Sequence, residues 1–160
     1  MSSPPAIDPP GKRRIGFGRA PRRGYITCEV SELEWRFESV GEIYPSSTLA
    51  EIMALLRAQG APDSDFDSTE LICVELFGNL IRHARGAVRI ELDWSGEYPR
   101  LSVIDIQKRS AAAPIRLPAD PLAESGRGLF IIKALAKELR VSDTGGEGSV
   151  TCATLPVRRA

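Results

Sequence analysis

Apolar residues recur at helical spacing in the first half of the chain. Residues 46–59 carry a stripe of four apolar side chains, Leu49, Ile52, Met53 and Leu56. Intervals of three and four place such side chains on one face of a helix. Gly60 follows directly and is a typical helix terminator, while Thr48 and Glu51 have the spacing of a capping box. The pattern predicts an amphipathic helix over residues 46–59.

A second helical pattern covers residues 67–85 and ends before Gly86. Its apolar stripe consists of Cys73, Phe77, Leu80 and Ala84, with Ile81 alongside. Asp67 and Glu70 lie in the first turn, where acidic side chains cap a helix and interact favourably with its dipole. We expect these two residues to cap the second helix.

Alternating residues then predict strands. Four apolar residues alternate with charged ones, namely Val88, Ile90, Leu92 and Trp94. This alternation is typical of a half-buried strand. Ser95-Gly96 turns the chain, and residues 101–106 return as a more apolar strand. Residues 25–40 are rich in β-forming residues and predict one or two further strands.

The last third of the chain combines a long loop, a helix and a hairpin. Residues 107–125 show no clear periodicity, and loops of this length in compact domains often form lids. A helix is predicted from Gly126 to Arg140, and Gly145-Gly146 marks a hairpin between strands near 138–142 and 149–155. The predicted fold class is α+β, a two-layer sandwich of one mixed, mostly antiparallel sheet with helices on one face.

Composition and charge divide the chain in two. The 160 residues, 42% of them hydrophobic, suffice for one globular domain with a core. Residues 1–24 hold six basic residues, one acidic residue and five prolines, so we predict a disordered basic tail ahead of a domain at 25–160. We expect the tail to be solvated, with no direct contact to nucleic acid.

Other classes of protein are disfavoured by what the sequence lacks. It shows neither the apolar core of a signal peptide nor a run long enough to span a bilayer, so no membrane contact and a cytoplasmic location are expected. Cys28, Cys73 and Cys152 do not have the spacing of metal ligands. We interpret all three as structural, buried thiols.

Two features carry candidate chemistry. Glu75 and Asn79 lie four residues apart and therefore share one helix face. A carboxylate can take a proton or hold an activating water, and an amide oxygen is a hard ligand suited to Mg²⁺. The run Gly126-Arg127-Gly128 opens the third helix, where glycines let backbone amides approach a ligand and the helix N-terminus attracts phosphate. Together these features indicate nucleotide chemistry.

Four motifs in this order resemble the ATPase domain of the GHKL superfamily over residues 25–156. They are Glu75-x-x-x-Asn79 followed by His83-Ala84, Asp105 at the end of a strand, Gly126-Arg-Gly128-Leu, and Gly146-Glu-Gly148-Ser-Val-Thr-Cys-Ala-Thr-Leu-Pro156. The small size and the Gly-Arg-Gly-Leu form of the glycine motif most resemble the anti-sigma-factor serine kinases of bacterial partner-switching systems.

The resemblance implies a Bergerat-type ATP-binding fold and a role for each matching residue. Glu75 would be the general base, Asn79 would ligate Mg²⁺ bound to ATP, and Asp105 would accept a hydrogen bond from the adenine amino group. Gly126, Arg127 and Gly128 would line the phosphates, with Ser149 near the adenine. The implied partners are a STAS-type anti-anti-sigma protein, which receives the phosphate on a serine, and a sigma factor. A homodimer is also expected from the resemblance.

The chain departs from the family after Asp105. The family's Asp-x-Gly-x-Gly reads here Asp105-Ile-Gln107-Lys-Arg109, so long side chains replace both glycines. Either Gln107 or Arg109 contacts the nucleotide in an altered site, or the chain is a nucleotide-independent partner-switching module. A third interpretation is a detached histidine-kinase-like ATPase domain. Because His83 is the only histidine and lies in the site helix, its phosphoacceptor would have to come from another protein.

Overall fold

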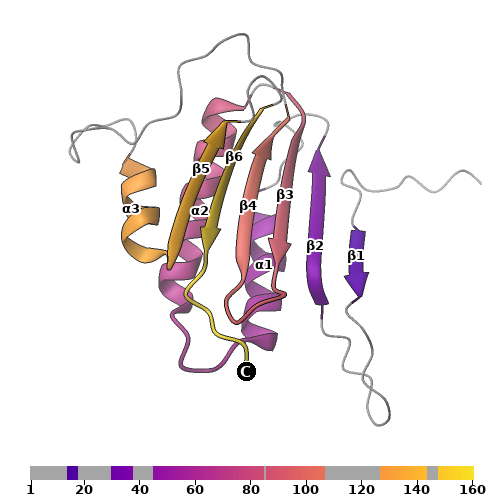
Figure 1. Cartoon of the computed structure of the whole chain (residues 1–160), viewed down its shortest axis with the longest axis vertical. Coiled ribbons are helices and arrows are strands. Elements are labelled where there is room, and N and C mark those ends of the chain that lie inside the picture. Colours follow the sequence, from indigo (N-terminus) through magenta and orange to yellow (C-terminus); the bar gives the residue numbers. More distant parts are fainter. Residues whose placement is uncertain (1–13, 18–29, 38–44, 85, 107–126, 144–147) are drawn as a thin grey trace, which may run out of the picture.

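The computed structural model describes residues 14–17, 30–37, 45–84, 86–106, 127–143 and 148–160. Its centre is a six-stranded sheet in the order β1-β2-β3-β4-β6-β5, in which every neighbouring pair is antiparallel. The strands are β1 (Arg14–Phe17), β2 (Val30–Phe37), β3 (Val88–Asp93), β4 (Arg100–Asp105), β5 (Glu138–Asp143) and β6 (Ser149–Thr154). Figure 1 shows them side by side.

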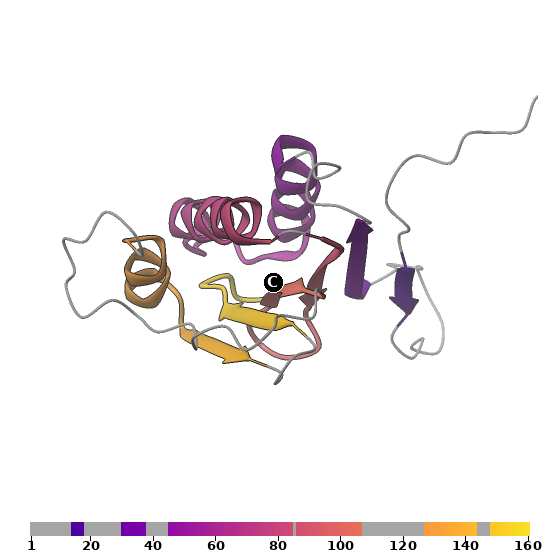
Figure 2. The ribbon, with the colours of Figure 1, turned by 90° about the horizontal axis from the view of Figure 1, so that it is seen from above.

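Three helices cover one face of this sheet, as Figure 2 shows from above. They are α1 (Pro45–Gln59), α2 (Phe66–His83) and α3 (Arg127–Leu135). The core lies between the helices and alternate residues of the strands, such as Trp35, Ile90 and Leu101. The predicted α+β sandwich with helices on one face is therefore confirmed, and all described strand pairs are antiparallel.

Helix α1 buries the predicted stripe, with Ile52, Met53 and Leu56 inside the core. The predicted capping box at its start is wrong, because the helix begins at Pro45 and Thr48 lies buried in its first turns. Glu51 instead accepts a hydrogen bond from Nε1 of Trp35 at 3.2 Å. Glu51 therefore makes a contact between α1 and the sheet and does not take part in a capping box.

Helix α2 begins earlier than its pattern predicted. Its N-cap is Asp65, whose side chain accepts a hydrogen bond from the backbone N–H of Ser68 at 3.0 Å. Hydrogen bonds from the Ser68 side chain and, second, from its backbone N–H lower the pKa of the Asp65 carboxyl. The prediction that Asp67 and Glu70 cap the helix is wrong, since both lie inside it. The sheet-facing stripe is buried as expected, but Ile81 is 40% exposed and does not belong to it.

Two further boundaries differ from the sequence prediction. Helix α3 ends at Leu135 and does not reach Arg140, because the backbone of Lys137 already donates to Thr154 and strand β5 pairs with β6 from Glu138 onward. Strand β1 lies within the segment predicted to be a disordered tail and pairs with β2. The other residues of that segment lie outside the described ones.

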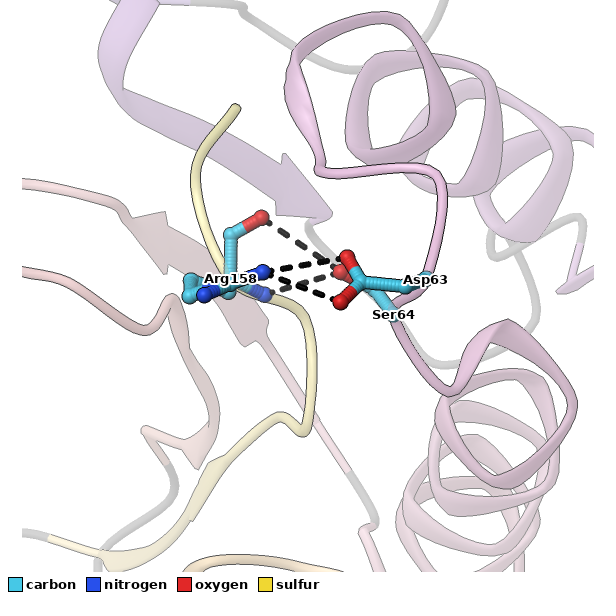
Figure 3. A network of polar contacts seen from close by, with 3 residues as sticks. All are labelled: Asp63, Ser64 and Arg158. Atoms are coloured by element: carbon cyan, nitrogen blue, oxygen red, sulfur yellow. Dashed lines mark hydrogen bonds and ion pairs between the residues drawn. The ribbon is translucent and has the colours of Figure 1, made fainter.

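The last six residues pack against the end of the molecule at which α1 and α2 are joined. Leu155 and Val157 are fully buried, and the backbone N–H of Ala160 donates to the carbonyl of Gln59 at 2.9 Å. Nη2 of Arg158 donates to both carboxylate oxygens of Asp63, at 3.1 Å to Oδ1 and 3.0 Å to Oδ2. The backbone N–H of Arg158 donates to Oγ of Ser64 (Figure 3). This segment therefore ties the sheet to the α1–α2 connection.

Two of the predicted structural thiols can be placed. Cys73 is fully buried on the sheet-facing side of α2, and burial raises the pKa of its thiol to about 12. Cys152 is half-buried in β6, and Cys28 lies outside the described residues. Within the described ranges, no helix has the length and apolarity that crossing a membrane requires.

Candidate functional site

Glu75 and Asn79 occupy the C-terminal half of α2, one turn apart on the helix face that is turned toward α3. Both are half-buried, whereas Leu76 and Leu80 beside them are buried in the core. The apolar neighbours fix the rotation of the helix, because their burial against the sheet is favourable only in one orientation. A carboxylate and a carboxamide are thereby held at the edge of the core, where a ligand can reach them.

Gly128, the second residue of α3, lies directly against this pair. A Cβ atom at Gly128 would lie 2.6 Å from Oε2 of Glu75 and 3.2 and 3.3 Å from Nδ2 and Oδ1 of Asn79. The absence of a side chain therefore lets the first turn of α3 approach both polar groups. The first N–H groups of a helix have no partner within the helix and carry its positive dipole end. An acid, an amide and an anion-attracting backbone thus meet at one place.

Asp105 ends strand β4 and is only 4% exposed. It is the only carboxyl group among the buried residues of the described chain. By strand alternation it lies on the helix-covered face, in line with Leu101 and Val103. The strand end therefore carries a hydrogen-bond acceptor on the helix-covered face, where the predicted contact to adenine would require one.

Gly148 has no side chain, and this allows its backbone to lie close to that of Asp105. Its φ of +120° is a conformation that side chains rarely adopt, and a Cβ atom there would overlap the carbonyl oxygen of Asp105. Ser149 follows and is the direct register partner of Asp105 across β4 and β6. Directly opposed residues of an antiparallel pair project to the same face. Ser149 is therefore a neighbour of Asp105 on the helix-covered side, and its place near an adenine stays a prediction.

Arg82 contacts a residue of the candidate site, and the sequence interpretation did not name it. Its Nη2 donates to Oδ1 of Asn79 at 3.3 Å, and its Nε donates to the carbonyl of Gly78 at 3.1 Å. The first contact orients the carboxamide, because the accepting oxygen turns toward the guanidinium. The signal in the sequence was the spacing of three residues between Asn79 and Arg82 on one helix.

Of the remaining predicted site residues, the structure describes some and not others. Arg127 is the exposed first residue of α3. Gly126, Gln107 and Arg109 lie outside the described residues. No group of three or more metal-ligating His, Cys, Asp or Glu side chains occurs in the described part of the chain.

The fold and these two groups of residues define a class. A helix N-terminus that begins with glycine and lies beside an acid and an amide is suited to binding phosphates. A buried carboxyl group at the end of a strand is suited to accepting a hydrogen bond from a donor group of a nucleotide base. An antiparallel sheet covered on one face by helices carries both. These are the features of a nucleotide-binding ATPase domain.

The comparison with known families identifies that domain. The family model of the histidine kinase-like ATPase domain matches residues 44–155, which is most of the chain. The chain therefore belongs to the histidine kinase-like ATPase domain family, and the resemblance to the GHKL superfamily is confirmed. No curated protein matches the chain. Membership implies ATP binding, typically with Mg²⁺, and the arrangement of Glu75, Asn79 and Gly128 fits that ligand.

Proposed function

We propose that this chain is an ATP-dependent protein serine/threonine kinase of the anti-sigma-factor type. The observation that carries the proposal is the approach of Gly128 to Glu75 and Asn79. It brings the candidate general base and the candidate metal ligand to the start of α3, where phosphates would bind. Phosphoryl transfer relies mainly on positioning and on neutralisation of charge, and this arrangement supplies both.

Each residue has a defined task in the proposed reaction. Glu75 accepts the proton of a serine hydroxyl. The serine oxygen forms a bond to the γ-phosphorus of ATP, while the bond from that phosphorus to the bridging oxygen breaks and ADP leaves. Asn79 would hold Mg²⁺, which would supply neutralisation of the phosphate charge, and Arg82 orients that carboxamide. Asp105 accepts a hydrogen bond from the adenine amino group. Gly128 and Arg127 provide backbone and charge for the phosphates.

The proposed acceptor is a serine of a STAS-type anti-anti-sigma protein, and a sigma factor is the proposed alternative partner. Nucleotide state and phosphorylation would then decide which partner is held. This part of the proposal rests on the Gly126-Arg-Gly128-Leu form of the glycine motif and on the small size of the domain.

Phosphate transfer tests the proposal directly. The full chain is incubated with Mg-ATP and with each STAS-domain protein encoded in the same genome, and the products are weighed by intact mass spectrometry. We expect one STAS protein to gain one phosphate with wild type and none with Glu75→Gln. The Glu75→Gln variant should still bind Mg-ATP, since the amide keeps the size of the side chain. A STAS protein that binds the chain and gains no phosphate would overturn the kinase proposal.

A second candidate function is a nucleotide-independent partner-switching module, favoured by Gln107 and Arg109 in place of two glycines. A thermal-shift titration separates the two functions. Ligand binding at 100 times Kd stabilises the native state by about 2.7 kcal/mol, so a working site gives a saturable rise of Tm with Mg-ATP. Asp105→Asn should weaken that rise. A flat titration with wild type would favour the binding module.

A further inference from the structure

Arg82 lies in the last turn of α2 and makes two contacts with residues that precede it on the same helix. Its Nε donates to the carbonyl of Gly78 at 3.1 Å, and its Nη2 donates to Oδ1 of Asn79 at 3.3 Å. Side chains of a helix point back toward its N-terminus, so an arginine can reach groups three and four positions earlier. The guanidinium group of Arg82 is thereby held beside the carboxamide of the candidate site.

The residue at position 78 leaves room for this guanidinium group. A Cβ atom at Gly78 would lie 3.5 Å from Nη2 of Arg82. A methyl group would fit at that distance, but a longer side chain would extend into the space of the guanidinium group. A small residue at position 78 therefore permits the contact between Arg82 and Asn79.

The oxygen that accepts from Arg82 is the one that would hold Mg²⁺. Mg²⁺ takes oxygen ligands at about 2.0–2.1 Å, and Oδ1 is the only oxygen of the Asn79 side chain. If Oδ1 kept both partners, the metal and Nη2 would lie less than about 5.5 Å apart. Two cations at this distance repel each other, and a guanidinium group stays charged. Arg82 and Mg²⁺ therefore compete for the same oxygen.

Of the two side chains, Arg82 is the one that is free to turn away. The first turn of α3 lies against the carboxamide, since a Cβ atom at Gly128 would lie 3.2 Å from Nδ2 and 3.3 Å from Oδ1 of Asn79. Asn79 is half-buried, whereas Arg82 is exposed. The net contribution of one hydrogen bond to stability is modest. Displacement of Arg82 from Oδ1 therefore leaves both helices in place.

We propose that Arg82 sets how strongly Mg²⁺ and a nucleotide support each other's binding to this chain. While its guanidinium group donates to Asn79, it orients the carboxamide and occupies the oxygen that the metal requires. Asn79 can hold Mg²⁺ only after Arg82 has turned away, and this step reduces the affinity that the metal adds. Arg82 is thus a positioning residue. The inference rests on the proposed metal-binding role of Asn79 and is independent of the proposed phosphate acceptor.

Binding of ADP with and without the metal tests this inference in the absence of turnover. Isothermal calorimetry gives the Kd of ADP for the full chain in EDTA and in saturating MgCl2, and we call the ratio of the two values the coupling factor. Because both values come from the same variant, a uniform loss of affinity cancels. Arg82→Met removes the guanidinium group and keeps a long side chain, so the coupling factor should rise roughly three- to tenfold.

Two further variants separate competition at Oδ1 from a general effect of charge. Arg57→Met removes an exposed arginine of α1 and should leave the coupling factor unchanged. In an Asn79→Ala background the shared oxygen is absent, so Arg82→Met should then have no effect on the coupling factor. An effect of the same size in that background would overturn the inference. A coupling factor that Arg82→Met leaves unchanged or lowers in the otherwise wild-type chain would overturn it as well.

The same measurements distinguish failure of this inference from failure of the proposed function. ADP binding whose coupling factor responds to Asn79→Ala and not to Arg82→Met overturns only the competition. A chain that binds no ADP overturns both the competition and the proposed function. A coupling factor that Asn79→Ala does not reduce overturns both as well, because Asn79 then has no metal-binding role.

Discussion

Gly128 allows the start of α3 to contact Glu75, and a methyl group in its place would meet the flexible end of that side chain. We expect Gly128→Ala to push the carboxylate of Glu75 aside and to leave the fold intact, because alanine also favours the helix by about 1 kcal/mol. Tm should change little, while the affinity for Mg-ATP falls roughly tenfold or more. Isothermal calorimetry and thermal denaturation measure the two quantities. Gly96→Ala is the control, since nothing lies within 4 Å of a Cβ atom there.

At Gly148 we expect the same substitution to alanine to have the opposite effect on stability. A Cβ atom there would overlap backbone atoms of Asp105, which cannot rotate away, and φ is +120°. Gly148→Ala should therefore cost several kcal/mol of unfolding free energy, about 3 or more. Urea denaturation of the two alanine variants compares them directly. Equal losses of stability at Gly128 and Gly148 would contradict the distinction between a flexible and a rigid neighbour.

The candidate site was predictable in part from single residues. Glu75 and Asn79 are four residues apart, so their common face follows from helix geometry alone. No spacing relates Asn79 to Gly128, because these residues meet only when α2 and α3 pack. Their association could be inferred from the resemblance, and the structure gives the contact. Arg82 was missed because an arginine near the end of a helix is usually explained by the helix dipole.

At the scale of the element, the start of α2 depends on Asp65. Hydrogen bonds from the side chain and from the backbone N–H of Ser68 lower the pKa of its carboxyl, so the folded state binds a proton less readily than the unfolded state. Stability from this cap is therefore present above the unfolded pKa and is lost as pH falls through the folded value. We expect Asp65→Ala to lower the unfolding free energy by about 1 kcal/mol at neutral pH. The difference from wild type should shrink below about pH 4.

Urea titrations at several pH values measure this effect. Asp63→Ala is a useful comparison, since Asp63 is exposed and lies outside the helix. A difference between Asp65→Ala and wild type that persists unchanged at the lowest pH would show that the carboxylate does not cap the helix through its charge.

Element boundaries were harder to predict than element types, for identifiable reasons. Asp63, Asp65 and Asp67 all precede or open α2, and only the backbone geometry selects Asp65 as the cap. Leu139 fits both the helical stripe of α3 and the alternation of a strand. Pairing with β6 resolves this ambiguity, because the contact between Leu139 and Ala153 is not visible in local sequence. The prediction failed where a long-range partner determined the outcome.

At the scale of the whole molecule, residues 155–160 link the sheet to the α1–α2 connection. Val157 is fully buried, while Arg158 next to it forms an exposed ion pair with Asp63. We expect Val157→Ala to cost about 2 kcal/mol, since buried methyl groups are lost and a cavity remains. Arg158→Ala should cost about 0.5 kcal/mol or less, because exposed ion pairs contribute little.

Thermal denaturation distinguishes these neighbours. With about 2–4 °C per kcal/mol for a chain of this size, Val157→Ala should lower Tm by roughly 4–8 °C and Arg158→Ala by about 2 °C or less. A larger loss at Arg158 than at Val157 would mean that the ion pair, and not the apolar contact, fastens the segment.

The pairing of β4 with β6 has a consequence for the order in which the domain folds. Strands β3 and β4 are neighbours in the chain, as are β5 and β6, and such hairpins form within microseconds. Joining β4 to β6 requires closure of the long segment between residues 105 and 149, which delays it. Asp105 meets Gly148 and Ser149 only through that late pairing. A chain arrested before this step would have most of its secondary structure and no place for a nucleotide.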